Sequence, residues 1–167
     1  MMLLLVATLF SLQPPSVQAL PKIGQPAPLY AFSAVVPTDA APVAVADLTP
    51  EALKGKVVVL DFFATWCGPC VASIPHTNDL IASLSDQPVV FLAVGNEEPT
   101  VIEPFLKTHP MRATLVLDRD GQTYGNYFIG KLPFVVVIAP DGRVASFQHP
   151  SQLSKAVIEQ AIGGAVR

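Results

Sequence analysis

The stretch VVVLDFFATWCGPC, residues 57–70, joins a run of β-branched and aromatic side chains to Cys67 and Cys70, the only two cysteines of the chain. The near-continuous apolar run over residues 57–63 is typical of a strand that is covered on both faces. After it, apolar and small side chains recur at spacings of three and four as far as Leu84, which predicts a helix over residues 67–84. The stretch therefore predicts a buried strand followed at once by a helix with both cysteines in its first turn.

The rest of the chain alternates strands and helices. We expect strands over 89–94, 113–117, 134–139 and 144–147, and helices over 100–107 and 151–162. This order implies an α/β domain with a central mixed β-sheet flanked by helices, and we assign residues 51–167 to it. A chain of 167 residues is long enough to bury the core of one such domain.

Two segments precede the domain. Residues 1–19 are uncharged, with an apolar run, two prolines and small residues up to Ala19, which is the pattern of a secretory signal peptide. An uncleaved anchor and a buried N-terminal helix are the alternatives, but the apolar run is short for the first and Pro14 and Pro15 interrupt the second. Residues 20–50 are rich in proline and alanine, which indicates an N-terminal extension with one possible hairpin.

The predicted signal peptide gives an expectation for localisation. We expect export to the bacterial periplasm or another extracytoplasmic compartment, or membrane anchoring if residues 1–19 are retained.

Charge and composition exclude several classes of binding partner and cofactor. The formal net charge of −3 does not provide the basic surface that nucleic-acid-binding or polybasic membrane-binding proteins use. The three histidines lack a paired ligand spacing, which argues against a zinc site, and there is no glycine-rich dinucleotide fingerprint. We therefore expect no nucleic acid, no metal, and no cofactor beyond the redox-active Cys67–Cys70 pair.

A C-x-x-C pair at the start of a helix has a definite chemical consequence. Cys67 lies where unpaired backbone N–H groups and the helix dipole favour negative charge, so it should be the more acidic thiol. Its thiolate attacks a substrate disulfide, and Cys70, one turn further in, then attacks the mixed disulfide and releases the product. A static structural bridge is the alternative, but so short a loop constrains the unfolded chain little.

Asp61 lies inside the apolar run. A buried carboxylate is unfavourable unless it is satisfied or used, and burial should raise its pKa. Near the inner sulfur, its carboxyl could exchange a proton with Cys70 as that thiol attacks or leaves. The alternative is an aspartate at the strand end that points to water. We expect Asp61 to be catalytic together with the two cysteines.

The motif WCGPC, preceded by DFFAT, is similar to the thioredoxin active site. In thioredoxins an aspartate lies six residues before the first cysteine, where this chain has Asp61, and a proline lies eight residues after it, where this chain has Pro75. The dipeptide Gly68–Pro69 also matches, and in that family it accompanies reducing members.

The wider pattern resembles the exported TlpA/ResA-like thiol-disulfide oxidoreductases of the thioredoxin superfamily. Three blocks are in the family's order: IGQPAPLYAF (23–32), LKGKVVVLDFFATWCGPC (53–70) and LPFVVVIAPDGRV (132–144). The resemblance covers nearly all of the chain after residue 20 and implies a thioredoxin fold. This chain differs from these relatives in two respects. Exported members often have Asn in place of Asp61, and the strand over 89–94 of this chain lacks the lysine that thioredoxin places near its aspartate.

The resemblance also implies how substrate binds. The family has a cis-proline before the strand that faces the cysteines, where this chain has Leu132–Pro133, and the backbone of Leu132 would pair with the substrate chain. Trp66 would supply an apolar contact beside Cys67, although a lone tryptophan is more often simple packing, and Gly68 and Pro69 are the other residues expected to bind substrate. Some cytochrome c maturation members place an acidic group near the cysteines, and Glu97 is the candidate here.

These observations predict an exported enzyme that reduces disulfides in other exported proteins, with their isomerisation or formation as the alternative directions, and cytochrome c maturation is among the family's roles. Electrons would come from a partner, and a membrane thiol transporter is the plausible class. Two alternatives stay open: a thiol peroxidase, because peroxiredoxins share the fold, and a non-catalytic binding module whose pair stays oxidised.

Overall fold

Strand β2 (Val57–Phe62), formed by the apolar run, lies inside a six-stranded sheet of order β1-β4-β3-β2-β5-β6. The computed structural model describes residues 20–164, so the predicted signal peptide, residues 1–19, lies outside the described residues. The other strands are β1 (Ala34–Val36), β3 (Val89–Gly95), β4 (Thr114–Leu117), β5 (Phe134–Ile138) and β6 (Val144–Gln148). The helices are α1 (Gly68–Ser83), α2 (Pro99–Leu106), α3 (Gln122–Asn126) and α4 (Lys155–Ile162), with the 3-10 helices η1 (Val45–Leu48) and η2 (Pro150–Gln152).

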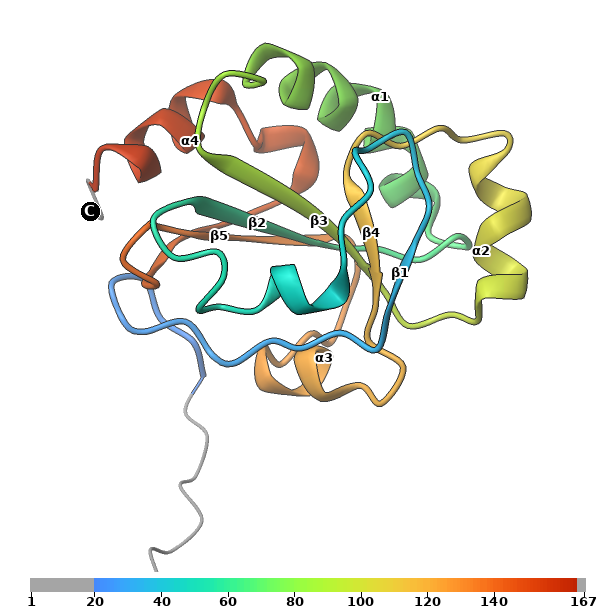
Figure 1. The fold of residues 1–167 in the computed structure, drawn as a ribbon, viewed down its shortest axis with the longest axis horizontal. Coiled ribbons are helices and arrows are strands. Elements are labelled where there is room, and N and C mark those ends of the chain that lie inside the picture. Colours follow the sequence, from blue (N-terminus) through green and yellow to red (C-terminus); the bar gives the residue numbers. More distant parts are fainter. Residues whose placement is uncertain (1–19, 165–167) are drawn as a thin grey trace, which may run out of the picture.

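The sheet is mixed, as predicted. β2, β3 and β4 run parallel, whereas β5 pairs antiparallel with β2, β6 with β5, and β1 with β4. A parallel connection needs a crossover, and α1 and α2 provide the two crossovers between β2, β3 and β4 (Figure 1). The carboxyl ends of the three parallel strands therefore meet at one edge of the sheet, and the cysteine helix begins there.

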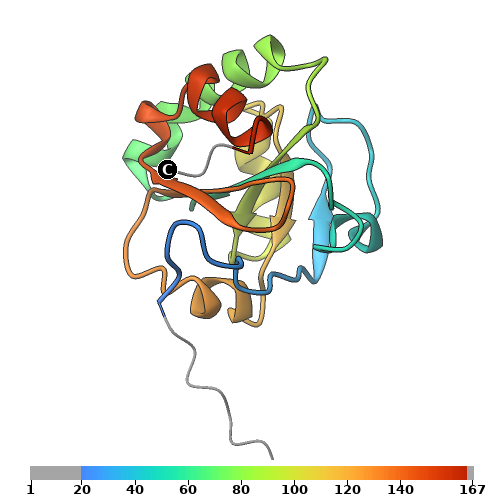
Figure 2. The same ribbon diagram turned by 90° about the vertical axis from the view of Figure 1, so that its left-hand side faces the viewer.

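Side chains of β2 alternate between two cores. Val57 and Val59 join the cluster under α1, α2 and α4, whereas Val58 and Leu60 join the cluster on the opposite face, beside η1 and α3. Two views related by a quarter turn show α1 and α4 on one side of the sheet and α3 on the other (Figures 1 and 2). The continuous apolar run is explained by burial on both faces. Among residues 20–164, no helix has the length and apolar character needed to cross a membrane.

The N-terminal extension does not contain the hairpin that the sequence suggested. Residues 20–50 contribute one strand, β1, and its partner is β4, with Val36 opposite Leu115. Pro37 follows β1 directly and Pro42 precedes the second apolar stretch, and neither residue has the N–H that a returning strand would need. The extension instead covers the edge of β4, and its Tyr30 is buried in the core.

Phe128 has a backbone conformation that disfavours its own side chain. It follows α3 with φ +54°, and it is about half exposed. The N–H of Phe128 donates to Gly125 at 3.0 Å and that of Ile129 to Tyr124 at 3.0 Å, which is the helix ending that usually has glycine at the left-handed position.

We predict that Phe128→Gly raises the free energy of unfolding by about 1 kcal/mol, because the left-handed region costs a non-glycine residue roughly 1–2 kcal/mol and the extra freedom of glycine in the unfolded chain offsets part of that. Urea denaturation measures it. Phe128→Ala is the control, since it removes the ring and keeps the strain. A gain as large in Phe128→Ala as in Phe128→Gly would show that backbone strain is not the cause.

Candidate active site

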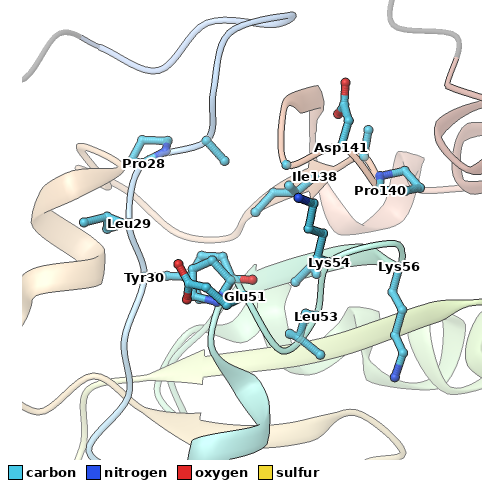
Figure 3. A pocket seen from close by; sticks show the side chains of 15 residues that line it. Pro28, Leu29, Tyr30, Glu51, Leu53, Lys54, Lys56, Ile138, Pro140 and Asp141 are labelled. Carbon is cyan, nitrogen blue, oxygen red and sulfur yellow. The ribbon is translucent and has the colours of Figure 1, made fainter.

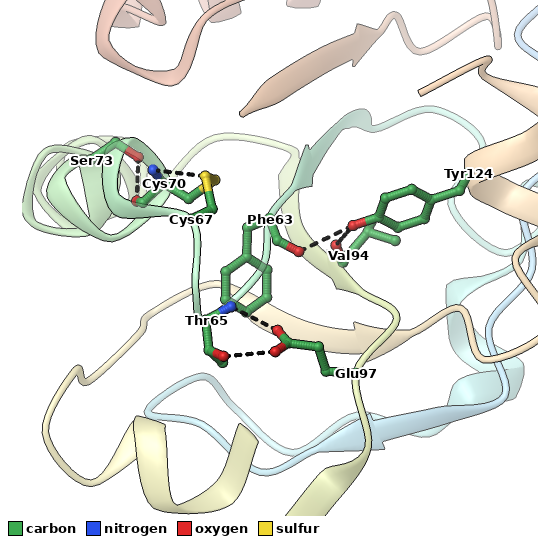
Figure 4. The surroundings of a disulfide bond; sticks show 8 residues. All are labelled: Phe63, Thr65, Cys67, Cys70, Ser73, Val94, Glu97 and Tyr124. Atoms are coloured by element: carbon green, nitrogen blue, oxygen red, sulfur yellow. Dashed lines mark hydrogen bonds between the residues drawn. A yellow bond between two sulfur atoms is a disulfide. The ribbon is translucent and has the colours of Figure 1, made fainter. Parts of the chain in front are cut away.

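Cys67 and Cys70 form a disulfide at the amino end of α1, with 2.05 Å between the sulfurs and 5.2 Å between the Cα atoms (Figure 4). Cys67 is the N-cap residue, and its Sγ accepts a hydrogen bond from the backbone N–H of Cys70 at 3.3 Å. An N–H group at a helix start has no partner within the helix, so it is free to stabilise charge on this sulfur. The geometry favours a thiolate at Cys67 when the pair is reduced.

The two cysteines differ little in exposure. Cys67 is 5% exposed and Cys70 is 3% exposed, so the hydrogen bond, more than accessibility, distinguishes the two sulfurs in the oxidised state. Around them the surface is open: Trp66 is 75% exposed, and Gly68 and Pro69 are exposed at the first two positions of α1. Proline fits there because the first N–H groups of a helix need no intrahelical acceptor. Trp66 is therefore available for contact instead of being packed in the core.

Asp61 lies on the same face of the sheet as the cysteines. It follows Val57 and Val59 in the alternation of β2, and it pairs with Ala93 of β3 and Val135 of β5, which belong to the cluster that contains both cysteines. Its side chain is half-buried, and burial raises the pKa of Asp61 to about 7. The predicted rise is confirmed, and the carboxyl can take up or release a proton near neutral pH.

The Leu132–Pro133 peptide bond is cis, as the resemblance implied. β5 begins directly after it, and Phe134 pairs with Phe62 at the carboxyl end of β2. Because β2 and β5 are antiparallel, the start of one and the end of the other lie at the same edge of the sheet. Leu132 also packs against the cluster that contains the cysteines. The expected substrate-binding backbone thus lies at the edge where β2 continues into residues 63–67, the cysteine loop.

Glu97 contacts the cysteine loop directly. Its carboxylate accepts from the backbone N–H of Thr65 at 2.6 Å and from the Thr65 hydroxyl at 2.7 Å, two residues before Cys67 (Figure 4). The sequence suggested an acidic group near the cysteines, and the structure shows what this carboxylate holds. The neighbouring Glu98 points elsewhere and pairs with Arg119 at 2.7 Å.

Two further residues at this edge were missed by sequence reasoning. Thr65 is one, and Tyr124 of α3 is the other, since its hydroxyl lies 3.1 Å from the carbonyl of Phe63 and 3.0 Å from that of Val94. Contacts so far apart in the chain leave no spacing signal. His76 of α1 contacts the carbonyl of Leu153, the residue after η2, at 2.7 Å.

A separate pocket lies at the opposite edge of the sheet, with a volume of about 250 Å³ (Figure 3). Its lining includes Tyr30, Glu51 and Lys54, together with Val58 at the start of β2 and Pro140 after β5. None of the predicted site residues lines it, so it is not part of the cysteine site. Within residues 20–164 no group of three or more histidine, cysteine or acidic side chains is arranged to hold a metal ion.

The chain is similar to known proteins in sequence. A family model described as the AhpC/TSA family matches residues 23–147. The thiol-disulfide oxidoreductase ResA of Geobacillus thermodenitrificans is 36% identical over 92 residues, which cover 54% of this chain and 53% of that protein. ResA of Bacillus cereus is 32% identical over 93 residues, which cover 55% and 54%. The chain thus spans about half the length of the curated relatives it matches.

Solved structures agree over a longer span. A thiol:disulfide interchange protein DsbE from Chlorobium tepidum is 29% identical with a TM-score of 0.67, covering 88% of this chain and 99% of that one. A thiol-disulfide oxidoreductase from Bacteroides vulgatus is 24% identical with a TM-score of 0.67, covering 84% and 96%. At the lower identity the likeness shows the fold alone.

Proposed function

The chain belongs to the AhpC/TSA family and has a thioredoxin-like fold, and on this premise we propose that it is a thiol-disulfide oxidoreductase acting through Cys67 and Cys70. The observation that carries the proposal is the hydrogen bond from the N–H of Cys70 to the Cys67 sulfur at the mouth of α1. It marks Cys67 as the sulfur that the helix stabilises as an anion, which is the species that attacks a disulfide.

The exchange takes two steps. The Cys67 thiolate attacks one sulfur of the client disulfide, that S–S bond breaks, and the first client sulfur leaves as a thiolate that takes up a proton. Cys70 then loses its proton and attacks the Cys67 sulfur, which breaks the mixed disulfide and releases the second client sulfur as a thiolate that also takes up a proton. The client has gained two electrons and two protons, and the Cys67–Cys70 disulfide that the structure shows has formed.

The surrounding residues have separate roles in this proposal. Asp61 accepts the proton of Cys70 in the second step, which its position and its pKa of about 7 support. Trp66 offers an exposed apolar surface to the client beside Cys67. The backbone at Leu132–Pro133 pairs with the client chain at the same edge of the sheet, and Gly68 and Pro69 complete the contact surface.

We further propose that the protein works as a reductase of disulfides in exported proteins. The signal-like composition of residues 1–19 supports export, and the similarity to ResA and DsbE proteins supports an extracytoplasmic role. The oxidised pair must be reduced again after each cycle, so a dithiol donor is required. A membrane thiol transporter is the class of partner that could supply electrons outside the cytoplasm.

Turnover of a protein disulfide tests the proposal. With excess dithiothreitol, the protein should accelerate the reduction of insulin disulfides. The same protein alkylated at Cys67 should give the rate of dithiothreitol alone. The rate is followed by the turbidity of the released insulin chain. A non-catalytic binding module would leave insulin reduction at the uncatalysed rate before and after alkylation.

A thiol peroxidase is the second candidate, and the AhpC/TSA match is what favours testing it. Such an enzyme would use a lone peroxidatic cysteine in a different setting, whereas both cysteines of this chain are in one disulfide. Dithiol-driven consumption of hydrogen peroxide separates the two activities. We expect consumption no faster than that of dithiothreitol alone, and a fast rate that Cys67→Ser abolishes would assign the peroxidase instead.

A further inference from the structure

Tyr124 lies where β2 and β3 end and the cysteine loop begins (Figure 4). Its hydroxyl is within hydrogen-bond distance of two carbonyl oxygens, of Phe63 at 3.1 Å and of Val94 at 3.0 Å. The ring packs edge-on against Phe62, with 5.0 Å between ring centroids and an interplanar angle of 86°. Packing thus fixes the ring, and the hydroxyl bridges Phe63, directly after β2, and Val94, next to the last residue of β3.

Asp118 holds Tyr124 from the other side. Asp118 is buried after β4, and its carboxylate accepts from the backbone N–H groups of Thr123 at 3.0 Å and of Tyr124 at 2.7 Å. Burial, together with the nearby carboxylates of Asp118, Glu97 and Asp61, raises the pKa of the Tyr124 hydroxyl. The hydroxyl therefore stays protonated and remains a donor over the pH range in which thiols exchange.

The segment from Phe63 to Cys67 is anchored at both ends. At its start, the Phe63 N–H donates to Val94 at 3.1 Å and the Phe63 carbonyl faces Tyr124. Further on, Thr65 is held by Glu97, and the Cys67 N–H donates to Ala64 at 3.0 Å. The position of the Cys67 sulfur depends on these anchors, because only a few residues separate them.

We propose that Tyr124 is a positioning residue for Cys67: its hydroxyl fixes the ends of β2 and β3 so that the loop presents the Cys67 sulfur to the N–H of Cys70. The inference rests on the proposed thiol exchange and adds a residue from the opposite face of the sheet to that site. The hydrogen bond to the sulfur is 3.3 Å long, and such bonds weaken steeply when their geometry is disturbed. Loosening the loop therefore lowers the thiolate fraction of Cys67.

The chain offers a closely matched pair of variants. Tyr124→Phe removes the hydroxyl that joins Phe63 and Val94. Tyr127→Phe removes a hydroxyl from the next turn of the chain, whose ring also lies against Phe62, at 5.8 Å, but whose partner is the carbonyl of Pro28 in the N-terminal extension, at 2.8 Å. Both variants lose one tyrosine hydroxyl bond, so a loss of stability alone would be common to both.

The measurement is the rate of Cys67 alkylation by iodoacetamide in the reduced protein across a pH series. At pH 7 we expect Tyr124→Phe to react roughly fivefold more slowly than wild type, the factor that one lost hydrogen bond would give. The two rates should converge at high pH, where the thiol ionises without help. Tyr127→Phe should follow the wild-type profile.

Equal profiles for Tyr124→Phe and wild type, or the same slowing in both tyrosine variants, overturn the inference. Should Tyr124→Phe not fold, Thr65→Val loosens the same segment by removing one bond to Glu97, and an unchanged profile there overturns it as well. A wild-type Cys67 that titrates like free cysteine would instead overturn the proposed function itself, and the inference with it. An activated wild-type Cys67 is thus the condition under which the variants test Tyr124 alone.

Discussion

Cys70→Ser is expected to lower the steady-state rate of insulin reduction by at least about a hundredfold while leaving the first attack by Cys67 intact. The second step is intramolecular in the wild type, because Cys70 is bonded to Cys67 across one helical turn. A serine hydroxyl cannot take its place, so an external thiol must resolve the mixed disulfide in a bimolecular step, and loss of such proximity has large effects on rate.

The variant should also accumulate client proteins as mixed disulfides on Cys67. A non-reducing gel of Cys70→Ser after exposure to oxidised clients should show adducts that dithiothreitol releases. Cys67→Ser is the matched control, since it keeps one thiol but not the one at the helix mouth, and it should form few adducts. Adducts of equal amount on both variants would contradict the assignment of Cys67 as the attacking sulfur. The captured proteins would also identify the client class, including whether cytochromes c are among them.

Elements with a strong local pattern were predictable from the sequence. The strand expected over 57–63 is β2 over 57–62, and the helix expected over 67–84 is α1 over 68–83. A strand that is buried on both faces needs a continuous apolar run, and a helix with one buried face needs apolar residues at spacings of three and four. Both patterns occur within a short stretch of the chain, so they can be recognised without knowledge of the fold.

Elements that depend on distant contacts were not predictable. Helix α3 has five residues and contains Gly125, so it has no apolar period, and it is held by the Asp118 carboxylate at its start. The last helix begins at Lys155, later than expected, because Pro150–Gln152 forms a separate 3-10 turn and Ser154 caps α4. β1 found its partner β4 far along the chain.

The residues of the candidate site show the same difference between local patterns and distant contacts. Cys67, Cys70 and Asp61 were found because one strand and the helix that follows carry all three within ten residues. The bonds from Thr65 to Glu97 and from Tyr124 to Phe63 span 32 and 61 residues, so they exist only once β2, β3 and α3 have come together. The reactive residues were therefore predictable from the sequence, whereas the hydrogen bonds that hold them in place were not.

Asp61→Asn is expected to make the oxidised protein more stable at pH 8 and no more stable at pH 4. Burial raises the pKa of Asp61 from 3.8 to about 7 in the folded protein, so between these values the native state holds a proton that the unfolded state has lost. Stability must then fall as the pH rises from about 4 to about 7, and it levels off above. Asparagine has the same shape and no charge to bury, so the variant escapes this loss.

The rise in the pKa of Asp61 from 3.8 to about 7 sets an upper limit of about 4 kcal/mol on the gain in the free energy of unfolding. The side chain is only half-buried, and solvent screening reduces the effect, so we expect roughly 2 kcal/mol at pH 8. Urea denaturation at pH 4 and pH 8 measures it, with the exposed Asp86→Asn as the control for removing one negative charge. A stability difference that is the same at both pH values would mean that Asp61 is ionised as readily in the folded as in the unfolded chain.

The same substitution should slow thiol-disulfide exchange, although it stabilises the folded protein. With reduced protein at pH 7, Asp61→Asn should attack a client disulfide at nearly the wild-type rate, because that step belongs to Cys67 at the helix mouth. Release of the client should slow by roughly a hundredfold, the lower end of what a positioned acid or base contributes, because Cys70 has lost its proton acceptor. Rapid mixing separates the two steps, and raising the pH should restore the second one as Cys70 ionises into bulk solvent. Equal rates for both steps in wild type and variant would remove Asp61 from the mechanism. A slower second step beside a more stable fold would show that the carboxylate is kept for its proton and not for the stability of the sheet that contains it.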